Sequence, residues 1–154
     1  MMTKDEVSDF LDREFPQIHI GGRAFSIDEL APGVAVMRLS AQDRHLRPGG
    51  TVSGPSLFAL ADLAAYVAVL GHLGPVGLAV TTSATINFLS KPDPGDLLCT
   101  CRILKAGKRL FVVECATRAE GSDAIVAHVT MTYSIPALGG AQADGSPRSA
   151  GEWP

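Results

Sequence analysis

The sequence predicts an α+β domain in which an antiparallel β-sheet curls around one long, apolar α-helix. Residues 53–73 form an almost uninterrupted apolar run rich in alanine, whereas residues 78–135 alternate between apolar and polar side chains. A helix that is apolar on every side must be enclosed by protein, and a period of two is typical of half-buried strands. The sheet is therefore expected to wrap round the helix, with another subunit covering the rest.

Length and composition favour a single domain. The chain has 154 residues, of which 46% are hydrophobic, and its net charge of −3 gives no general attraction to nucleic acid or anionic lipid. We expect residues 1–136 to form the domain and residues 137–154, rich in Gly, Ala and Ser, to be a disordered tail.

The acidic N-terminus is unlike a signal or transit peptide, so we expect a cytoplasmic protein. The three cysteines are expected to be buried apolar residues, not metal ligands or disulfides.

The first elements follow from local spacing. Apolar residues at helical intervals predict an amphipathic helix within residues 1–16. Phe25–Ile27 and Val34–Leu39 are expected to form a hairpin, followed by a polar loop over residues 41–52.

The long helix is predicted over residues 53–73. Gly54 and Pro55 suit an N-cap and first turn, and Gly74 is expected to end the helix. A membrane span is the alternative for such an apolar run, but the central Asp62 and the strand-rich remainder argue against it.

Four strands are predicted after the helix. Val80, Thr82, Ala84, Ile86 and Phe88 alternate along the first strand, and KPDPGD is expected to form the turn that follows. The remaining three strands are expected at Leu97–Leu104, Leu110–Arg118 and Ile125–Ile135. Their short connections imply an antiparallel meander.

Asp62 is the most unusual residue, because it is the only formal charge between Arg47 and Lys91. It lies eight residues past Gly54, too deep in the helix to act as a cap. An ionised carboxylate in apolar surroundings is costly unless it has a partner, and such groups are typical of acid or base chemistry. A purely structural partner would satisfy it equally well, so this observation leaves both interpretations open.

The loop before the helix supports a functional interpretation. Residues 50–55 bring glycine-rich backbone to a helix N-terminus, where free amides suit a carbonyl or an oxyanion. We expect the helix face between Gly54 and Asp62 to be short. A bound carbonyl compound could then be polarised at Gly54 and attacked from Asp62. Ordinary turn and cap chemistry would also explain Gly50 and Gly54.

The segment GTVSGPSLFALADLAAY resembles the signature of the PaaI-like (phenylacetyl-CoA thioesterase-like) branch of hotdog thioesterases. The similarity continues in AVTTSATINFLSKPDPGD, KAGKRL and AHVTMTYSIP, and covers roughly residues 33–136. It implies a hotdog fold and an acyl-CoA thioesterase acting on small aryl or short- to medium-chain acyl groups. It also implies a homo-oligomer, a dimer or dimer of dimers, and no cofactor beyond the coenzyme A of the substrate. No metal site is expected, because His19, His72 and His128 have no carboxylate or cysteine at ligand spacing.

The resemblance assigns roles to three residues. Asp62 would be the nucleophile or the general base that activates water, and the Gly54 amide would polarise the thioester carbonyl. Thr81 would help to place the water, although a threonine in a strand is often structural.

The chain departs from the family pattern near the helix start. The family's Asn is Arg47, its His is Ser53 and its second Gly is Pro55. Arg47 could bind a carboxylate or phosphate or be solvated, and Ser53 could donate to the carbonyl or support the cap. His45, beside Arg47, could contact ligand.

The remaining expected contacts are with the two ends of the substrate. Phe58 and Tyr66 on the helix, together with Arg47, Gly50 and Ser53, are expected to bind the acyl and thioester part. The expected coenzyme A-binding residues are Lys91, Lys105, Lys108 and Arg109, which could also be solvated.

Two other functions remain open. A non-catalytic acyl-CoA-binding or regulatory protein is favoured if Arg47, Ser53 and Pro55 have removed the water-activating geometry. A hotdog dehydratase or hydratase would need an acid paired with a histidine, and no histidine follows Asp62 at a suggestive spacing. The absence of GxSxG and GxxxxGK elements argues against serine hydrolases and P-loop nucleotide-binding proteins.

Overall fold

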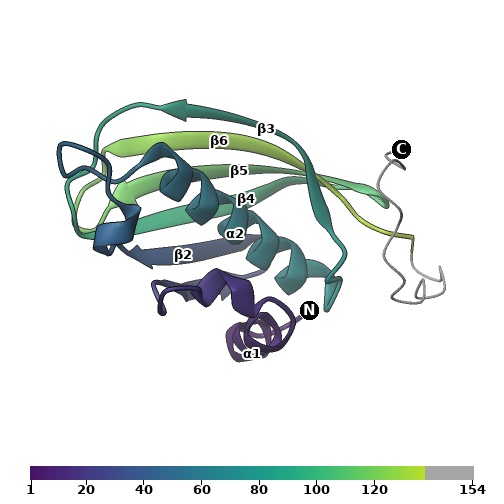
Figure 1. Ribbon diagram of the computed structural model, residues 1–154. Helices are drawn as coiled ribbons and strands as arrows, with labels where there is room; N and C mark the ends of the chain where they lie inside the picture. Colours follow the sequence, from purple (N-terminus) through teal and green to yellow (C-terminus); the bar gives the residue numbers. More distant parts are fainter. Residues whose placement is uncertain (138–154) are drawn as a thin grey trace, which may run out of the picture.

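The protein is a curved antiparallel sheet whose concave face holds one long helix (Figure 1). The computed structural model describes residues 1–137, so all but the first residue of the expected tail at 137–154 lies outside the described residues. The elements in chain order are α1 (Lys4–Glu14), β1 (Phe25–Ala31), β2 (Val34–Ser40), α2 (Gly54–Leu73), β3 (Val80–Phe88), β4 (Asp96–Ala106), β5 (Leu110–Ala119) and β6 (Ile125–Ser134). This arrangement confirms the α+β prediction and the hotdog architecture.

Helix α2 begins at Gly54, because its N-cap is Ser53 and not Gly54 as expected. The Ser53 hydroxyl accepts a hydrogen bond from the amide of Ser56, which a glycine has no side chain to do. Gly54 and Pro55 instead occupy the first two helical positions, where the missing amide of proline costs nothing. The N-cap prediction for Gly54 is therefore wrong, and the cap interpretation of Ser53 is confirmed.

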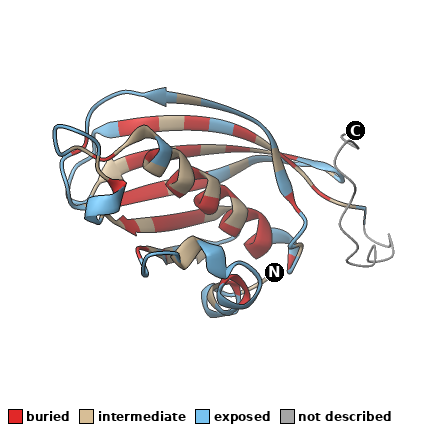
Figure 2. Ribbon diagram, in the orientation of Figure 1, coloured by how far each residue is buried: buried red, intermediate tan, exposed pale blue. Residues whose placement is uncertain are grey.

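Burial of α2 is strongest on the side that faces the sheet (Figure 2). The helix packs mainly on β2, β4 and β5. It is long and apolar enough to cross a membrane, but most of its apolar stretch is buried inside the protein, as expected of a core helix. Amphipathic α1 lies beside β1 and the end of α2, and buries Val7, Phe10 and Leu11. This burial makes the N-terminal helix part of the core.

The strand order β1-β2-β4-β5-β6-β3 corrects one expectation. Strands β4, β5 and β6 form the predicted meander, but β3 pairs with β6 at the sheet edge and β4 pairs with β2. The KPDPGD segment therefore connects strands that are not neighbours. Turn-forming residues mark where the chain bends, but partner choice is set by which apolar surfaces the sheet must bury around α2.

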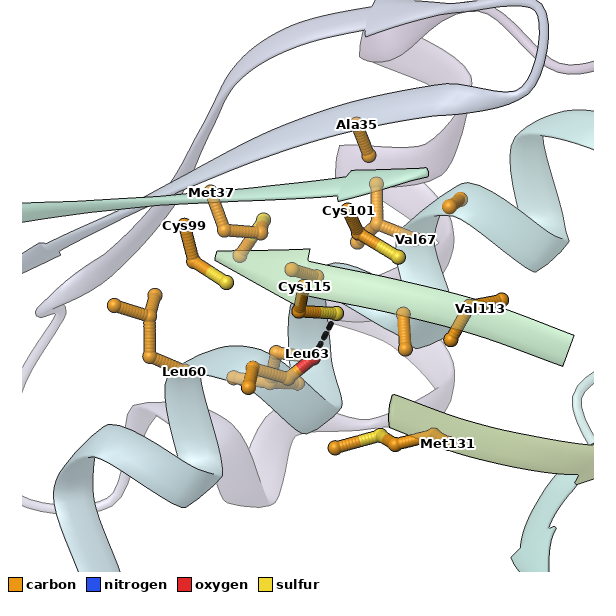
Figure 3. Close-up of a cluster of buried hydrophobic side chains, with 14 of the residues drawn as sticks. Ala35, Met37, Leu60, Leu63, Val67, Cys99, Cys101, Val113, Cys115 and Met131 are labelled. Carbon is orange, nitrogen blue, oxygen red and sulfur yellow. Dashed lines mark hydrogen bonds between the residues drawn. The ribbon is translucent and has the colours of Figure 1, made fainter. Parts of the chain in front are cut away.

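All three cysteines are buried in the layer between the sheet and α2, as predicted (Figure 3). Cys101 of β4 lies directly opposite Cys115 of β5. The Cys115 thiol contacts the carbonyl oxygen of Ala61 at 3.6 Å, immediately before Asp62 in the helix. The surroundings raise the pKa of the Cys115 thiol well above its ordinary value, chiefly through the neighbouring Cys101. The Cys115 thiol is therefore protonated, and all three buried cysteines act as small apolar side chains.

Candidate active site

One stripe of α2 is left half-buried (Figure 2), on the side toward edge strand β3. It consists of Gly54, Phe58, Asp62 and Tyr66, which follow one another at intervals of four residues and so share one helix face. The only charged residue of the helix is therefore on its most accessible face.

The Asp62 carboxylate is held at one of its two oxygens. Thr81 Oγ1 donates to Asp62 Oδ1 at 2.6 Å, and the Tyr133 hydroxyl lies 3.0 Å from the same Oδ1. The Tyr133 hydroxyl is also 3.0 Å from the main-chain carbonyl oxygen of Asp62. Within residues 1–137, Asp62 Oδ2 has no hydrogen-bond partner. It is also not one of the unpartnered polar atoms that are fully buried, so it remains accessible. The Oδ2 atom is therefore the open side of the carboxylate.

A β-bulge in β3 places Thr81 in this site. Thr81 lies opposite Tyr133, but the register shifts before Ser83, which lies opposite Thr132. Thr82 is the extra residue, and its hydroxyl donates to the Thr132 carbonyl at 3.2 Å. Simple alternation would put Thr81 and Ala84 on opposite faces, whereas the bulge puts both on the helix side. The expected uniform alternation from Val80 to Phe88 is therefore wrong at its start.

Tyr133 is the residue of this site that sequence reasoning missed. It is buried, and burial is the main reason why the pKa of its hydroxyl is well above the ordinary value, with the nearby Asp62 charge adding to the effect. The hydroxyl is therefore a permanent donor at neutral pH. A signal was present, because Val129, Met131 and Tyr133 form the inward-facing row of β6 and only the tyrosine carries a hydroxyl.

Asp62 forms part of the wall of a cavity of about 990 Å³ between α2, the end of α1 and the start of β3. The lining is aromatic and aliphatic, with a few polar groups. It comprises Phe10, Glu14, Phe15, Asp62, Leu63, Tyr66, Pro75, Val76, Gly77, Leu78, Ala79, Val80, Thr81, Tyr133, Pro136 and Ala137. Asp62, Thr81, Tyr66 and Tyr133 thus meet in one space, while Phe58 lies outside its lining.

Tyr66 is held at the cavity wall from two sides. Its hydroxyl donates to the Gly77 carbonyl at 3.1 Å, and its ring contacts Phe15 edge-to-face at 6.2 Å between centroids. Burial, followed by the nearby Glu14 carboxylate, raises the pKa of the Tyr66 hydroxyl. The expected ligand contact at Tyr66 is therefore compatible with its position.

The Gly54 amide is suited to an oxyanion but is far from Asp62 along the same helix. It is at the first helical position and has no acceptor within residues 1–137. Phe88 lies against it, 3.2 Å from the point that a Cβ atom would occupy. Eight residues of helix separate Gly54 from Asp62, which corresponds to about 12 Å. The expectation that both groups of one subunit act on one carbonyl is wrong, because reacting atoms must approach to about 3–3.5 Å.

The loop before α2 is a closed turn. Gly50 has a φ of 80° and donates its amide to the Arg47 carbonyl at 3.0 Å, so this amide is not free for a ligand. The Arg47 side chain is exposed at the N-terminal end of α2. The Ser53 hydroxyl donates to Ser56 Oγ at 3.0 Å as part of the cap.

His45 is buried under this loop. Its Nδ1 accepts a hydrogen bond from the Gln42 amide at 2.8 Å, and its ring contacts Phe25. Burial, and then the Arg44 charge, lower the pKa of the His45 imidazole. His45 is 8% exposed, so the expectation that it contacts ligand is wrong for this subunit.

The expected coenzyme A-binding residues fall at two ends of the sheet. Lys105, Lys108 and Arg109 surround the β4–β5 turn, and Arg109 Nε donates to the Ile135 carbonyl at 3.3 Å, next to the cavity wall at Pro136. Lys91 precedes β4 at its other end, about 30 Å away along the strand. One subunit therefore does not bring all four together. Within residues 1–137, no cluster of three or more His, Cys, Asp or Glu residues could hold a metal ion.

Comparison with known proteins agrees with the fold. The model of the thioesterase superfamily matches residues 49–126, just over half of the chain. A crystal structure from Silicibacter sp. TM1040, provisionally assigned as a thioesterase, is 54% identical, with a TM-score of 0.80 over 88% of this chain and 93% of that chain. A variant of the phenylacetic acid degradation protein PaaI from Thermus thermophilus is 25% identical, with a TM-score of 0.67 over 79% of this chain and 99% of that chain.

A third structure, from Streptococcus mutans UA159, was determined with bound acetyl-CoA. It is 22% identical, covers 75% of this chain and 90% of that chain, and has a TM-score of 0.66, which shows a common fold. The family match, the 54% identity and the helix-in-sheet architecture lead to one conclusion. The chain belongs to the thioesterase superfamily, as a PaaI-like hotdog-fold thioester hydrolase.

Proposed function

We propose that this protein hydrolyses small acyl-coenzyme A thioesters to the free acid and coenzyme A, with Asp62 as the reacting carboxylate. The observation that carries the proposal is the Asp62 carboxylate on a cavity wall, fixed at Oδ1 by Thr81 and Tyr133 and open at Oδ2. An oriented carboxylate with one free oxygen is suited either to remove a proton from water or to attack a carbonyl carbon.

Both routes break the same bond. As a general base, Asp62 Oδ2 takes a proton from a water molecule whose oxygen adds to the thioester carbonyl carbon. As a nucleophile, Oδ2 adds to that carbon itself, and water then hydrolyses the mixed anhydride. In either case the carbon–sulfur bond breaks, coenzyme A leaves as a thiolate that takes up a proton, and the carboxylic acid is released. A carboxylate and an amide donor supply this chemistry, so we propose that no cofactor is needed.

We propose that the active protein is a homo-oligomer in which Gly54 of one subunit and Asp62 of another serve one substrate. The distance between the two groups within one helix supports a shared site. Among the described strands, edge strand β3 pairs only with β6, and it is exposed along most of its length, including Val80 and Phe88. A second copy against this edge would cover unpaired backbone and bring a second α2 close to the first.

The substrate is proposed to enter from the β4–β5 turn. Lys105, Lys108 and Arg109 would bind phosphates of coenzyme A there, at the rim of the cavity that contains Asp62. The pantetheine arm would lie in the cavity beside Tyr66, and the acyl group would extend from Asp62 along the α2 stripe toward Phe58. Lys91 and Arg47 lie at the opposite end, where they could act only on a substrate bound mainly by another subunit.

The other two candidate functions predict different results. A dehydratase or hydratase would need a histidine beside Asp62, but the side-chain partners of Asp62 within residues 1–137 are Thr81 and Tyr133. A non-catalytic acyl-CoA-binding protein would bind thioesters without turnover.

We propose a cytoplasmic location, supported by the three free cysteines and by an N-terminal helix that belongs to the folded core.

The test is a hydrolysis screen over aryl, short-chain and medium-chain acyl-CoA thioesters with the native protein and Asp62→Asn. We expect the native protein to release coenzyme A thiol and the variant to be about 10²- to 10⁴-fold slower, as is typical when a general base is lost. Turnover that survives Asp62→Asn would contradict the role of Asp62. Saturable binding by the native protein without any turnover would support the acyl-CoA-binding alternative.

A further inference from the structure

We propose that Tyr133 is a positioning residue, which together with Thr81 holds Asp62 by Oδ1 so that Oδ2 is the oxygen that reacts. This inference rests on the proposed function and adds to it the reacting atom and the residue that selects it. It concerns a side chain on β6 that never needs to touch the substrate.

The two hydroxyls come from neighbouring strands, with Thr81 on β3 directly opposite Tyr133 on β6. Both converge on the same carboxylate oxygen, at 2.6 Å and 3.0 Å. Two donors on one oxygen fix the rotation of the carboxylate plane, whereas one donor on each oxygen would leave neither oxygen free. Only Oδ2 is then left for a substrate or a water molecule.

The Tyr133 hydroxyl has a single proton but two acceptors at 3.0 Å, the Asp62 carboxylate and the Asp62 main-chain carbonyl. It can donate to the carboxylate while Asp62 is ionised, and to the carbonyl after Oδ2 has taken up a proton. The buried phenol itself stays protonated throughout, because burial disfavours its anion.

The Tyr133 ring is 2% exposed and belongs to the hydrophobic core, so its hydroxyl cannot swing away with solvent. A hydroxyl on a packed ring keeps Asp62 aligned at less entropic cost than a mobile side chain would.

The direct test is Tyr133→Phe, which removes the hydroxyl and keeps the ring. For the preferred thioester of the native protein, we expect kcat to fall about 10- to 100-fold, the effect of losing one hydrogen bond to a charged group. KM should change less than about twofold, because the hydroxyl contacts Asp62 and not the substrate. The acid limb of the pH–rate profile should move to higher pH, since one of two donors that favour the carboxylate is gone.

A matched control and a second background separate positioning from packing. Thr117→Val removes another buried hydroxyl, on β5 and outside the cavity lining, and should leave kcat unchanged. In an Asp62→Asn background, Tyr133→Phe should cause no further loss of residual turnover. An equal loss in both backgrounds, or a kcat within about threefold of native together with an unshifted pH profile, would overturn the proposal.

A chemical substitution keeps the test valid if Tyr133→Phe does not fold. The chain has only two tyrosines, so fluorotyrosine incorporated into Tyr66→Phe protein replaces Tyr133 alone. The more acidic phenol is a stronger donor with the same packing. We expect the acid limb of its profile to move to lower pH than in Tyr66→Phe with ordinary tyrosine. An unchanged profile would count against the proposal.

A crystallographic comparison keeps this inference distinct from the proposed function. If the native protein hydrolyses no thioester, the proposed function fails, but the position of Asp62 can still be compared in native and Tyr133→Phe crystals. We expect a single carboxylate orientation in the native protein and a second one in the variant. An unmoved, singly oriented Asp62 in the variant would show that Tyr133 does not position it.

Discussion

Thr81 Oγ1 and Asp62 Oδ1 are joined by a 2.6 Å hydrogen bond between β3 and the middle of α2. The bond exists because one extra residue in β3 turns Thr81 toward the helix. Without this shift, the hydroxyl would face the outside of the sheet. The site is thus assembled by an irregularity of the strand.

Thr81→Val and Thr81→Ser should therefore behave differently. Valine has nearly the same shape but cannot donate, so we expect kcat for thioester hydrolysis to fall about tenfold or more, whereas serine should keep most of it. Steady-state hydrolysis of one acyl-CoA by both variants checks this. Equal rates for valine and serine would mean that the hydrogen bond is not used.

The Gly54 amide can be tested by substitution at the first helical position. Proline is well tolerated at the first helical position, and Ser53 already has the extended backbone that a following proline requires. Gly54→Pro removes the amide and should lower kcat by about 10²-fold or more. Gly54→Ala keeps the amide and adds a Cβ against Phe88, so it controls for crowding.

Mixing two inactive variants tests whether the site is shared between subunits. If Asp62 of one subunit works with Gly54 of another, subunit exchange between Gly54→Pro and Asp62→Asn proteins should restore about a quarter of native activity in a dimer. Each mixed dimer would contain one intact pair. No recovery despite proven exchange, or a strictly monomeric native protein by light scattering, would contradict a shared site.

The Ser53 cap should be a stability element with little effect on chemistry. Ser53→Ala removes the acceptor for the Ser56 amide and should lower the free energy of unfolding by about 1 kcal/mol, while Ser53→Asp should retain it. Urea unfolding of the three proteins measures the difference. A loss of kcat in Ser53→Ala without a loss of stability would instead favour a contact between Ser53 and substrate.

The ion pairs of Arg38 make the stability of the fold depend on pH in the acid range. It bridges Asp28, Asp96 and Glu120 on β1, β4 and the β5–β6 turn, with contacts of 2.7–2.9 Å. The guanidinium holds the pKa of Asp28 below its ordinary value of 3.8. A carboxyl group whose pKa is lower in the native state than in the unfolded state stabilises the native state when the pH is above the unfolded-state pKa. This stabilisation is lost as the pH falls through the native-state pKa.

Arg38→Leu should therefore be less stable than native at pH 6, by about 1 kcal/mol, and the difference should narrow at pH 3. Urea unfolding at the two pH values checks the sign. A difference that stays constant or grows toward pH 3 would mean that packing of the Arg38 stem, not its charge, is what matters.

Much of this fold follows from local patterns. The apolar run of α2 and the central strands β4 and β5 occur close to where the sequence predicts them, because each pattern reports which face of an element is buried. Strand β1 is longer than expected, running to Ala31, because a bulge at Asp28 lets it continue pairing while Asp28 reaches Arg38. Bulges and strand order depend on distant partners, and no local period encodes them.

The candidate site is predictable only in part for the same reason. Asp62 is visible as a charge in an apolar helix, and family resemblance identifies Thr81. Tyr133 lies 71 residues beyond Asp62 and meets it only after β6 has paired with β3. Helix geometry alone gives the distance between Gly54 and Asp62. That one subunit does not bring both groups to one carbonyl becomes clear only from the structure, in which the helix face that they share is left half-buried.

The apolar character of α2 also has a consequence for synthesis of the chain. This helix emerges from the ribosome before β4 and β5, which cover much of it in the folded protein. More than forty residues must follow Leu73 before β5 ends at Ala119. During that interval the nascent chain exposes a segment that is long and apolar enough to enter a membrane. Truncation between α2 and β5 should therefore yield an insoluble product, not a smaller folded unit.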